Sequence, residues 1–246
     1  MPQIVAAIHQ PNFFPWLGYF SKLAAADVFV FLDAVNFPKS SWVNRVKVRI
    51  GGEARWITCP VERSTMRATI AEVDIHDDTT WRRKLIASLE SNYARASHFD
   101  EVWPGLRERF DSKERNLASF NINVIQSIAR ELNLATRLVR QSELEEARVR
   151  NTRGSERLAS ICHAVNANVY LAGDGAAAYE DESVYAANNI AFRRLGFVHP
   201  TYPQGREDES FLPGLSILDA LFHVGWRGVR ELLDRSAATA DNQTAS

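Results

Sequence analysis

The sequence predicts an α/β fold with a Rossmann-like parallel sheet, an inserted β-hairpin region and a mainly helical C-terminal part. The segment 28–32, Val-Phe-Val-Phe-Leu, is an unbroken apolar run of strand length, which is typical of a central parallel strand buried on both faces. Strand-like and helix-like segments alternate before and after a different, hairpin-like region. Such alternation favours a doubly wound parallel sheet.

The first alternation occupies residues 4–32. Ile4 to Ile8 has the apolar character of a strand, and a proline-rich turn follows it. From Leu17 to Ala26 apolar side chains recur at helical spacing, and Asp27 ends this short helix. Together with the strand at 28–32, these segments predict one βαβ unit.

The region from Val43 to Ile75 predicts the inserted β-rich segment. Apolar and basic residues alternate over 45–50, Gly51-Gly52 marks a turn, and the pattern resumes at 56–58. This arrangement indicates a β-hairpin.

The remaining elements include a second alternation of helices and strands, over 117–172. We expect a strand over 70–75, helices from 78 or 79 to 93, over 99–113 and over 117–132, a strand over 137–140, a helix over 158–165, a strand over 169–172 and a helix over 216–223. Residues 1–235 are interpreted as a single α/β domain, and 236–246, which are small and polar, as a disordered tail.

The bulk composition limits the classes of function. The 246 residues are 46% hydrophobic and 24% charged, as in ordinary globular proteins. A formal net charge of -1 gives no global electrostatic reason to bind nucleic acid or an anionic membrane. Because the sequence has no signal peptide and no apolar run of about 20 residues, we expect a cytoplasmic protein without membrane insertion. Cys59 and Cys162 lack metal-ligand spacing, so neither a metal site nor a disulfide framework is expected, and the oligomeric state stays open.

The run from His9 to Tyr19 is the most informative segment for function. It brings His9, Gln10 and Asn12 to the point where a strand meets a helix, and Trp16 stands just before that helix. In open α/β sheets, small molecules bind beyond the carboxyl ends of the strands, where the next helix offers backbone N–H groups. We therefore expect these four residues to contact substrate, with His9 catalytic. The alternative is that they only cap the helix and satisfy the turn.

Asp33 follows the second strand, so we expect it at the same sheet edge as His9. A carboxylate, an imidazole and the ammonium of Lys39 in one crevice suit acid–base chemistry or the binding of a polar substrate. The alternative is that Asp33 accepts hydrogen bonds within the turn and that Lys39 is solvated.

Charged and aromatic residues also mark the predicted hairpin. Asn44 and Arg45 are expected to contact a ligand, because a guanidinium forms bidentate contacts with a carboxylate or phosphate. Trp42 is interpreted as a core anchor, although its ring could stack on a ligand. We expect Lys47 and Arg49 to lie on a solvated strand face.

A glycine turn, Gly173-Asp174-Gly175, follows the strand predicted over 169–172. Its backbone can approach a ligand closely, as glycine-rich turns between strand and helix do. The turn matches neither the dinucleotide fingerprint nor the P-loop pattern. Tyr179 lies close by in sequence, and we include it among the substrate-binding candidates, although a tyrosine there is as often structural.

The segment from His199 to Gln204 repeats the chemistry of the first turn. It adds His199, Tyr202 and Gln204 to the substrate-binding candidates, because two such rigid turns could face each other. Further along, Asp219 and His223 stand four residues apart and hence on one helix face. They could polarise one another, but a hydrogen bond on the helix surface is the favoured interpretation.

Several motifs occur in a distinctive order: IHQPNFFPWLGYFSKLAAADVFVFLDAVNFPKSSWVNR, YLAGDGAAAYEDE, HPTYPQ and FLPGLSILDALFHVGW. In these motifs the chain resembles the WbqC-like protein family, up to about Trp226. Members are similar to proteins encoded near surface-polysaccharide and O-antigen genes or other biosynthetic clusters. The resemblance thus implies a sugar-linked or small-molecule biosynthetic role. His223 stands where the family is expected to have Asn.

The opening motif also resembles nucleotidyltransferase-type Rossmann folds, which have an HxGH-like turn over the phosphates of ATP. In that comparison Asn12 and Gly18 occupy the analogous positions. The chain does not show the second lysine or serine motif of those enzymes, so the cofactor stays open and ATP with magnesium is a hypothesis from this resemblance.

The candidates together suit an enzyme of group transfer or ligation that acylates or aminoacylates an amino sugar or related amine, with a nucleotide sugar or amine as substrate. His9 or Asp33 would serve as the acid or base. Arg45 and Lys39 would neutralise an anionic substrate group, and the turn at 173–175 would admit its close approach. The alternatives are a non-catalytic binding module for a nucleotide sugar and a scaffold subunit.

Overall fold

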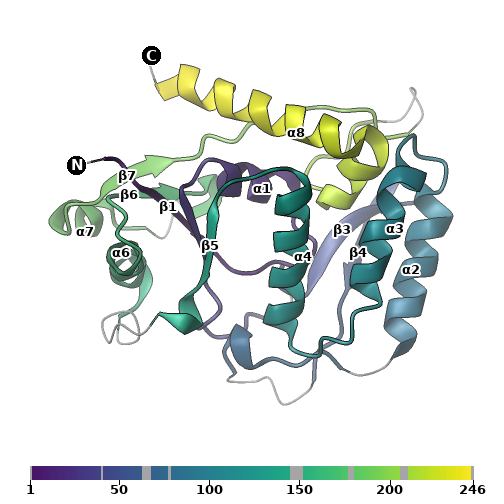
Figure 1. The fold of residues 1–246 in the computed structure, drawn as a ribbon, viewed down its shortest axis with the longest axis horizontal. Helices are drawn as coiled ribbons and strands as arrows, with labels where there is room; N and C mark the ends of the chain where they lie inside the picture. The colour runs from purple at the N-terminus through teal and green to yellow at the C-terminus, as the bar shows by residue number, and fades with distance from the viewer. Residues whose placement is uncertain are drawn as a thin grey trace.

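The fold is built on a five-stranded sheet in the order β5-β2-β1-β6-β7, as a computed structural model shows within the residues that it describes (Figure 1). The described residues are 2–39, 41–62, 68–76, 79–144, 152–176, 180–205 and 210–244. The strands are β1 (Val5–His9), β2 (Val28–Phe31), β5 (Arg137–Arg140), β6 (Val169–Ala172) and β7 (Ala191–Arg194). Every pairing between neighbours in this sheet is parallel, which confirms the predicted fold class.

The sheet is buried on both faces, as its continuous apolar strands require. Val5 and Ala7 of β1 belong to one apolar cluster, whereas Ala6 and Ile8 belong to a second. The first cluster includes residues of α1 (Leu17–Ala24), α4 (Leu117–Glu131) and α8 (Ile217–Thr244). The second includes residues of α6 (Gly154–Ala164) and α7 (Glu182–Ala187). The two faces of the sheet are thus covered by different helices (Figure 1).

The inserted hairpin forms as predicted. Strands β3 (Arg45–Ile50) and β4 (Glu53–Thr58) pair in antiparallel register, and Gly51 and Gly52 turn the chain with φ of 61° and 83°. Two successive positive φ angles are what a tight hairpin turn of this twist needs, and glycine adopts them without strain. The inward side chains of the hairpin, such as Val46 and Val48, join the first apolar cluster beside α2 (Thr79–Tyr93) and α3 (Phe99–Phe110).

Four segments differ from the sequence predictions. Residues 70–75 do not form a strand: η1 (Ile70–Glu72) is a 3-10 helix, and Thr69 and Glu72 close a capping box around it. The sequence does not predict α7 or β7, because α7 has only 6 residues and β7 only 4, too few to show a periodic pattern. Residues 236–244, which the sequence predicts to be disordered, continue α8 as helix. This extension contains several alanines, the best helix former.

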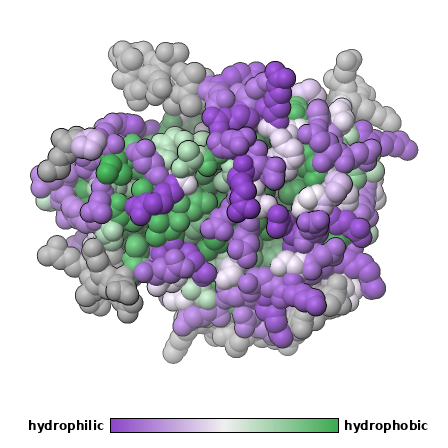
Figure 2. All heavy atoms as spheres, viewed as in Figure 1, coloured by the Kyte–Doolittle hydropathy of each residue, from purple (hydrophilic) through white to green (hydrophobic). Residues whose placement is uncertain are grey.

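The surface on the side viewed in Figure 2 is uneven in polarity. Apolar residues reach the surface between α6 and α4, over β5, while hydrophilic residues cover the exposed sides of α4 and α8. The apolar group includes Val139, Leu144 and Leu158, which are partly exposed around the second cluster. Within the described part of the chain, no helix combines the length and apolar composition needed to cross a bilayer.

Candidate functional site

The carboxyl ends of β1 and β6 lie side by side at the point where the sheet order reverses. After β1 the chain adds β2 and β5 on one side, and later adds β6 and β7 on the other. Ligands of open α/β proteins bind beyond the carboxyl ends of strands at such a switch point. His9 is the last residue of β1, and Gly173 follows β6 directly. We call the group formed by His9, Gln10, Lys22, Gly173 and Asp174 the β1/β6 edge.

Lys22 is the member of the β1/β6 edge that sequence reasoning missed. Its side chain comes from α1 and is only 4% exposed, and its Nζ donates a hydrogen bond of 2.8 Å to the carbonyl of Ile8. A Cβ added to Gly173 would lie 4.0 Å from this Nζ, so the ammonium stands directly beneath the glycine turn. The available signal was its spacing: Lys22 follows Tyr19 by three positions, on the helix face turned toward β1.

Burial governs the charge of Lys22. Desolvation lowers the pKa of its ammonium to about 8, and the nearby carboxylates of Glu180 and Asp174 oppose this shift. Glu180 itself accepts a hydrogen bond of 2.9 Å from the hydroxyl of Tyr170, and burial raises the pKa of Glu180. Its Oε2 atom is buried without a hydrogen-bond partner among the described residues. The ammonium is therefore close to carboxylates but holds no direct ion pair with them.

His9 is neutral at neutral pH in this setting. Burial, followed by the charge of Lys22, lowers the pKa of its imidazole to about 4. Its Nδ1 lies 3.2 Å from the carbonyl of Gln10, which also accepts a hydrogen bond of 3.1 Å from the hydroxyl of Tyr19. The ring of Tyr19 packs edge-on against the imidazole. The orientation of His9 is thus fixed by its neighbours.

The glycine turn after β6 is braced by its own aspartate. The two oxygens of Asp174 accept hydrogen bonds of 2.9 Å from the backbone N–H groups of Gly196 and Phe197. Asp174 therefore ties the turn to the segment after β7, and its predicted contact with substrate stays a prediction. Gly175 is exposed, and Tyr179 lies outside the described residues.

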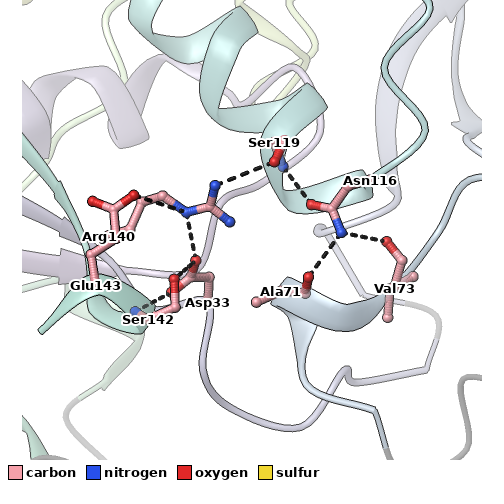
Figure 3. Close-up of polar contacts among 8 residues, drawn as sticks. All are labelled: Asp33, Ala71, Val73, Asn116, Ser119, Arg140, Ser142 and Glu143. Carbon is pink, nitrogen blue, oxygen red and sulfur yellow. Dashed lines mark hydrogen bonds and ion pairs between the residues drawn. The ribbon is translucent and has the colours of Figure 1, made fainter. Parts of the chain in front are cut away.

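Asp33 lies at the same edge of the sheet, and its side chain points toward Arg140 and Ser142 (Figure 3). Its carboxylate is 0% exposed and pairs with the Nε atom of Arg140, at the end of β5, over 2.9 Å. Ser142 donates two more hydrogen bonds, from its backbone N–H at 2.8 Å and from its hydroxyl at 2.7 Å. Arg140 also reaches the hydroxyl of Ser119 on α4. This group, which we call the Asp33 bridge, joins β2, β5 and α4; the catalytic role of Asp33 stays a prediction.

The proline-rich turn after β1 is held in place by hydrogen bonds from a side chain of α4. The side-chain amide of Asn121 donates to the carbonyls of Pro11 at 2.9 Å and Val43 at 2.7 Å. The backbone N–H of Phe13 donates to the carbonyl of Trp42. The turn and the start of the hairpin are therefore one connected unit. Asn12 is buried within it.

The two predicted rigid turns meet through aromatic rings. Trp16 stacks with His199 at 6.1 Å between ring centroids and meets Phe197 edge-on at 5.1 Å. Burial lowers the pKa of His199. Since Asp174 also holds Phe197, the turn containing His199 is linked to the β1/β6 edge.

The segment just before β3 differs from its prediction in the exposure of Trp42. Trp42, predicted to anchor the core, is 40% exposed, and its ring lies 4.9 Å from that of Trp56, which is 41% exposed. The guanidinium of Arg45 stacks 4.3 Å from the centroid of Trp56. The next residue, Val43, belongs to the core in its place, so Trp42 faces solvent. Asn44 is buried and donates to the carbonyl of Cys59, and Lys39 is exposed.

A second polar group surrounds Asp219, at the start of α8. Asp219 is fully buried and accepts hydrogen bonds from the hydroxyls of Tyr93 at 3.1 Å and Tyr202 at 3.2 Å. Gln204 donates to the hydroxyl of Tyr202 at 3.0 Å. Burial raises the pKa of Asp219 to about 6. The predicted hydrogen bond on the helix surface is wrong, because this face of α8 packs inside the protein.

Arg49 was also predicted to be solvated, and this prediction is wrong. Its side chain is buried beside the Asp219 group, and its Nη1 donates to the carbonyl of Gln204 at 2.6 Å. The backbone N–H of Arg49 donates to the hydroxyl of Tyr93. The strand alternation did not reveal this, because both faces of β3 are partly covered.

The candidate residues thus lie in several separate regions, among them the Asp33 bridge and the start of the hairpin. His9, Gln10 and the glycine turn gather at the β1/β6 edge, whereas Tyr202 and Gln204 belong to the Asp219 group. Within the described parts of the chain, no three His, Cys, Asp or Glu side chains lie together as a metal site would require. A phosphate-bearing cofactor would find its positive partner in Lys22.

Comparisons with known proteins agree with the resemblance carried by the motifs. A model of the WbqC-like protein family matches residues 10–231 of the chain. The chain is also 33% identical over 222 residues to "Uncharacterized protein Rv1507c" of Mycobacterium tuberculosis (strain ATCC 25618 / H37Rv), which covers 89% of this chain and 93% of that protein. No solved structure gives a significant match.

Proposed function

The chain belongs to the WbqC-like protein family, and from this premise we propose that it is a biosynthetic enzyme of group transfer or ligation that acts at the β1/β6 edge. One observation carries the proposal. A buried ammonium, Lys22, lies beneath the glycine turn and beside a neutral imidazole, at the switch point of a parallel sheet. Open α/β proteins bind small molecules at this place.

The two groups have complementary roles in the proposed reaction. The ammonium of Lys22 stabilises negative charge on a phosphate or on a developing oxyanion. Neutral His9 accepts a proton from the attacking amine. An anionic substrate bound beside His9 would raise the pKa of the imidazole, because a nearby negative charge favours the protonated form. Substrate binding would therefore make His9 a stronger base.

The proposed step is an acyl or aminoacyl transfer to an amino sugar or related amine. The amine nitrogen attacks the acyl carbon, the bond from that carbon to its phosphate leaving group breaks, and His9 takes the amine proton. ATP with magnesium would supply the activating phosphate in a ligation. Gly173 and Gly175 leave the backbone open to a phosphate, since neither has a side chain.

The cellular setting is proposed from the sequence. We infer that the protein acts in the cytoplasm on a small molecule, in surface-polysaccharide or other small-molecule biosynthesis, without binding nucleic acid. The near-neutral net charge of -1 supports the last point.

Mass spectrometry of reaction mixtures tests the proposal. Wild-type protein is incubated with ATP, magnesium, an amino acid and an amino sugar, and the amide product is measured. His9→Asn is expected to lower turnover about 100-fold, the usual contribution of a general base. His163→Asn changes an exposed histidine on α6 and serves as the matched control.

The outcomes separate the candidate functions. Nucleotide or nucleotide-sugar binding without product would favour the binding module. Equal turnover in His9→Asn and wild type would remove His9 from the chemistry. A large loss of thermal midpoint in His9→Asn would indicate that His9 only supports the turn.

A further inference from the structure

The two outer edges of the β3–β4 hairpin differ in their hydrogen bonds. In an antiparallel pair, residues that lie opposite each other turn their backbone groups either toward each other or outward. On β3 the outward groups have partners. The backbone N–H of Arg49 donates to the hydroxyl of Tyr93, and the carbonyl of Lys47 accepts from the backbone N–H of Ser216. The outer edge of β3 is therefore occupied.

The outer edge of β4 is open. Ala54 and Trp56 lie opposite these two residues of β3, so their backbone N–H and C=O groups point outward, and those of Thr58 follow by alternation. All three residues are exposed, and their outward groups have no hydrogen-bond partner among the described residues. The pairing runs over 53–58 without a bulge or a proline, two common devices that protect an edge. Another strand can therefore pair with β4.

An aromatic and cationic surface adjoins this open edge. The ring of Trp56, on β4, is 41% exposed and lies 4.9 Å from that of Trp42. The guanidinium of Arg45 lies 4.3 Å and the ammonium of Lys47 lies 5.3 Å from the centroid of the Trp56 ring. Both positive charges thus lie over a side chain of the edge strand, although their residues belong to β3. We call these four residues the Trp56 face.

The two cations of the Trp56 face have no carboxylate partner among the described residues; the contacts of both are with the Trp56 ring. The charged residues of β4, Glu53 and Arg55, pair with each other at 2.8 Å. A carboxylate that lies beside Trp56 would therefore meet unpaired positive charge. A second copy of the chain would bring the same two cations to the edge. Charge complementarity thus favours an acidic partner over self-association.

We propose that β4 is a docking strand for an extended, acidic segment of another polypeptide. The segment adds to β4 as a third strand of the hairpin sheet, with hydrogen bonds to the backbone of Ala54, Trp56 and Thr58. Alternate side chains of a strand share one face and lie about 7 Å apart, so acidic residues at every second position lie along the Trp56 face. This surface does not depend on the function proposed for the β1/β6 edge.

The test uses two synthetic heptapeptides, one that alternates glutamate with valine and one that alternates lysine with valine. Titration calorimetry measures their affinities for the full chain, and NMR follows amide hydrogen exchange. The glutamate peptide is expected to bind at least about tenfold more tightly than the lysine peptide. It should also slow exchange at Ala54, Trp56 and Thr58, because each N–H gains an acceptor. Equal affinities, binding without this protection, or no binding of the glutamate peptide at millimolar concentration would overturn the proposal.

A charge reversal on the Trp56 face tests the acidic character of the partner. Lys47→Glu should weaken binding of the glutamate peptide at least about tenfold and strengthen binding of the lysine peptide. Arg153→Glu makes the same change in net charge at an exposed residue just before α6, and this control should bind both peptides like wild type. Unchanged affinities in Lys47→Glu, with its thermal midpoint retained, would also overturn the proposal.

A proline on the open edge tests the backbone pairing. Ala54→Pro removes an outward N–H but no hydrogen bond between β3 and β4, because this N–H points away from β3. The variant should lose both the affinity for the glutamate peptide and the protection of the edge amides. Analytical ultracentrifugation of the protein without peptide should show a monomer. A dimer that Ala54→Pro dissociates would assign the edge to a second copy of the chain and overturn the proposal.

Discussion

The β1/β6 edge and the Asp33 bridge end neighbouring strands of one sheet, but they use their polar groups differently. In the Asp33 bridge, both carboxylate oxygens accept hydrogen bonds from Arg140 and Ser142. At the β1/β6 edge, Lys22 donates one hydrogen bond within the described residues, although an ammonium has three donors. Because both groups lie at the carboxyl edge of the sheet, both are candidates for a ligand site. Unused hydrogen-bonding capacity distinguishes a place for ligand from a structural brace.

The largest stability change is expected in the Asp33 bridge. Asp33→Ala removes the buried carboxylate that pairs with Arg140 and leaves two donors of Ser142 unpaired. The free energy of unfolding should fall by about 3 kcal/mol, as when one partner of a buried ion pair is lost. Urea denaturation measures this change. If Asp33→Ala kept its stability and lost turnover instead, the distinction between the two regions would fail.

The pH dependence of stability should reveal the lowered pKa of His9. Its pKa is about 4 in the folded protein and 6.5 as a model value, so the unfolded chain binds more protons between these values. Stability is then complete above pH 6.5 and is lost as pH falls toward 4. Wild type should lose about 2 kcal/mol more than His9→Asn over this interval. Parallel pH curves for the two proteins would show that burial does not perturb His9.

Loss of the Asn121 hydrogen bonds, which support the turn after β1, should change the free energy of unfolding by a smaller amount. Asn121→Ala removes the hydrogen bonds to the carbonyls of Pro11 and Val43. We expect unfolding to become easier by about 1.5 kcal/mol, for two buried hydrogen bonds. Thermal denaturation gives the value, and Asn123→Ala, on the same helix, is the control. A larger drop in turnover than in stability would mean that Asn121 positions the turn for chemistry.

The smallest effect is expected at the exposed tryptophans. Trp42→Ala should change the free energy of unfolding by about 0.5 kcal/mol, because the ring is not part of the core. Chemical denaturation followed by circular dichroism measures it without relying on tryptophan fluorescence. A loss of several kcal/mol would restore the predicted role of Trp42 as a core anchor.

The fold could be predicted from the sequence because the patterns that specify it are local. The apolar run at 28–32 and the alternation around it specify buried parallel strands, and the glycine pair at 51–52 specifies the hairpin turn. The strand expected over 70–75 failed for a nonlocal reason. Asn116 holds the carbonyls of Ala71 and Val73, which bends this segment against the start of α4 (Figure 3).

The candidate site was accessible only in part. His9 and the glycine turn were found because strand ends are visible in sequence. Lys22 and Arg49 were missed because basic residues on a helix or an alternating strand normally face solvent. The role of Asp33 depended on Arg140, which is 107 residues away and enters only through tertiary packing. Pairing over such distances leaves no local pattern.

A matched pair of lysine and arginine variants gives the most direct test of the central claim that the β1/β6 edge holds the ligand. Titration calorimetry compares binding of ATP with magnesium to wild type, Lys22→Met and Arg140→Met. Lys22→Met should weaken binding by at least about tenfold, since it removes a desolvated charge beside the ligand. Arg140→Met should lose stability but bind as tightly as wild type. Loss of affinity in Arg140→Met with none in Lys22→Met, or no binding to wild type at millimolar nucleotide, would contradict the account.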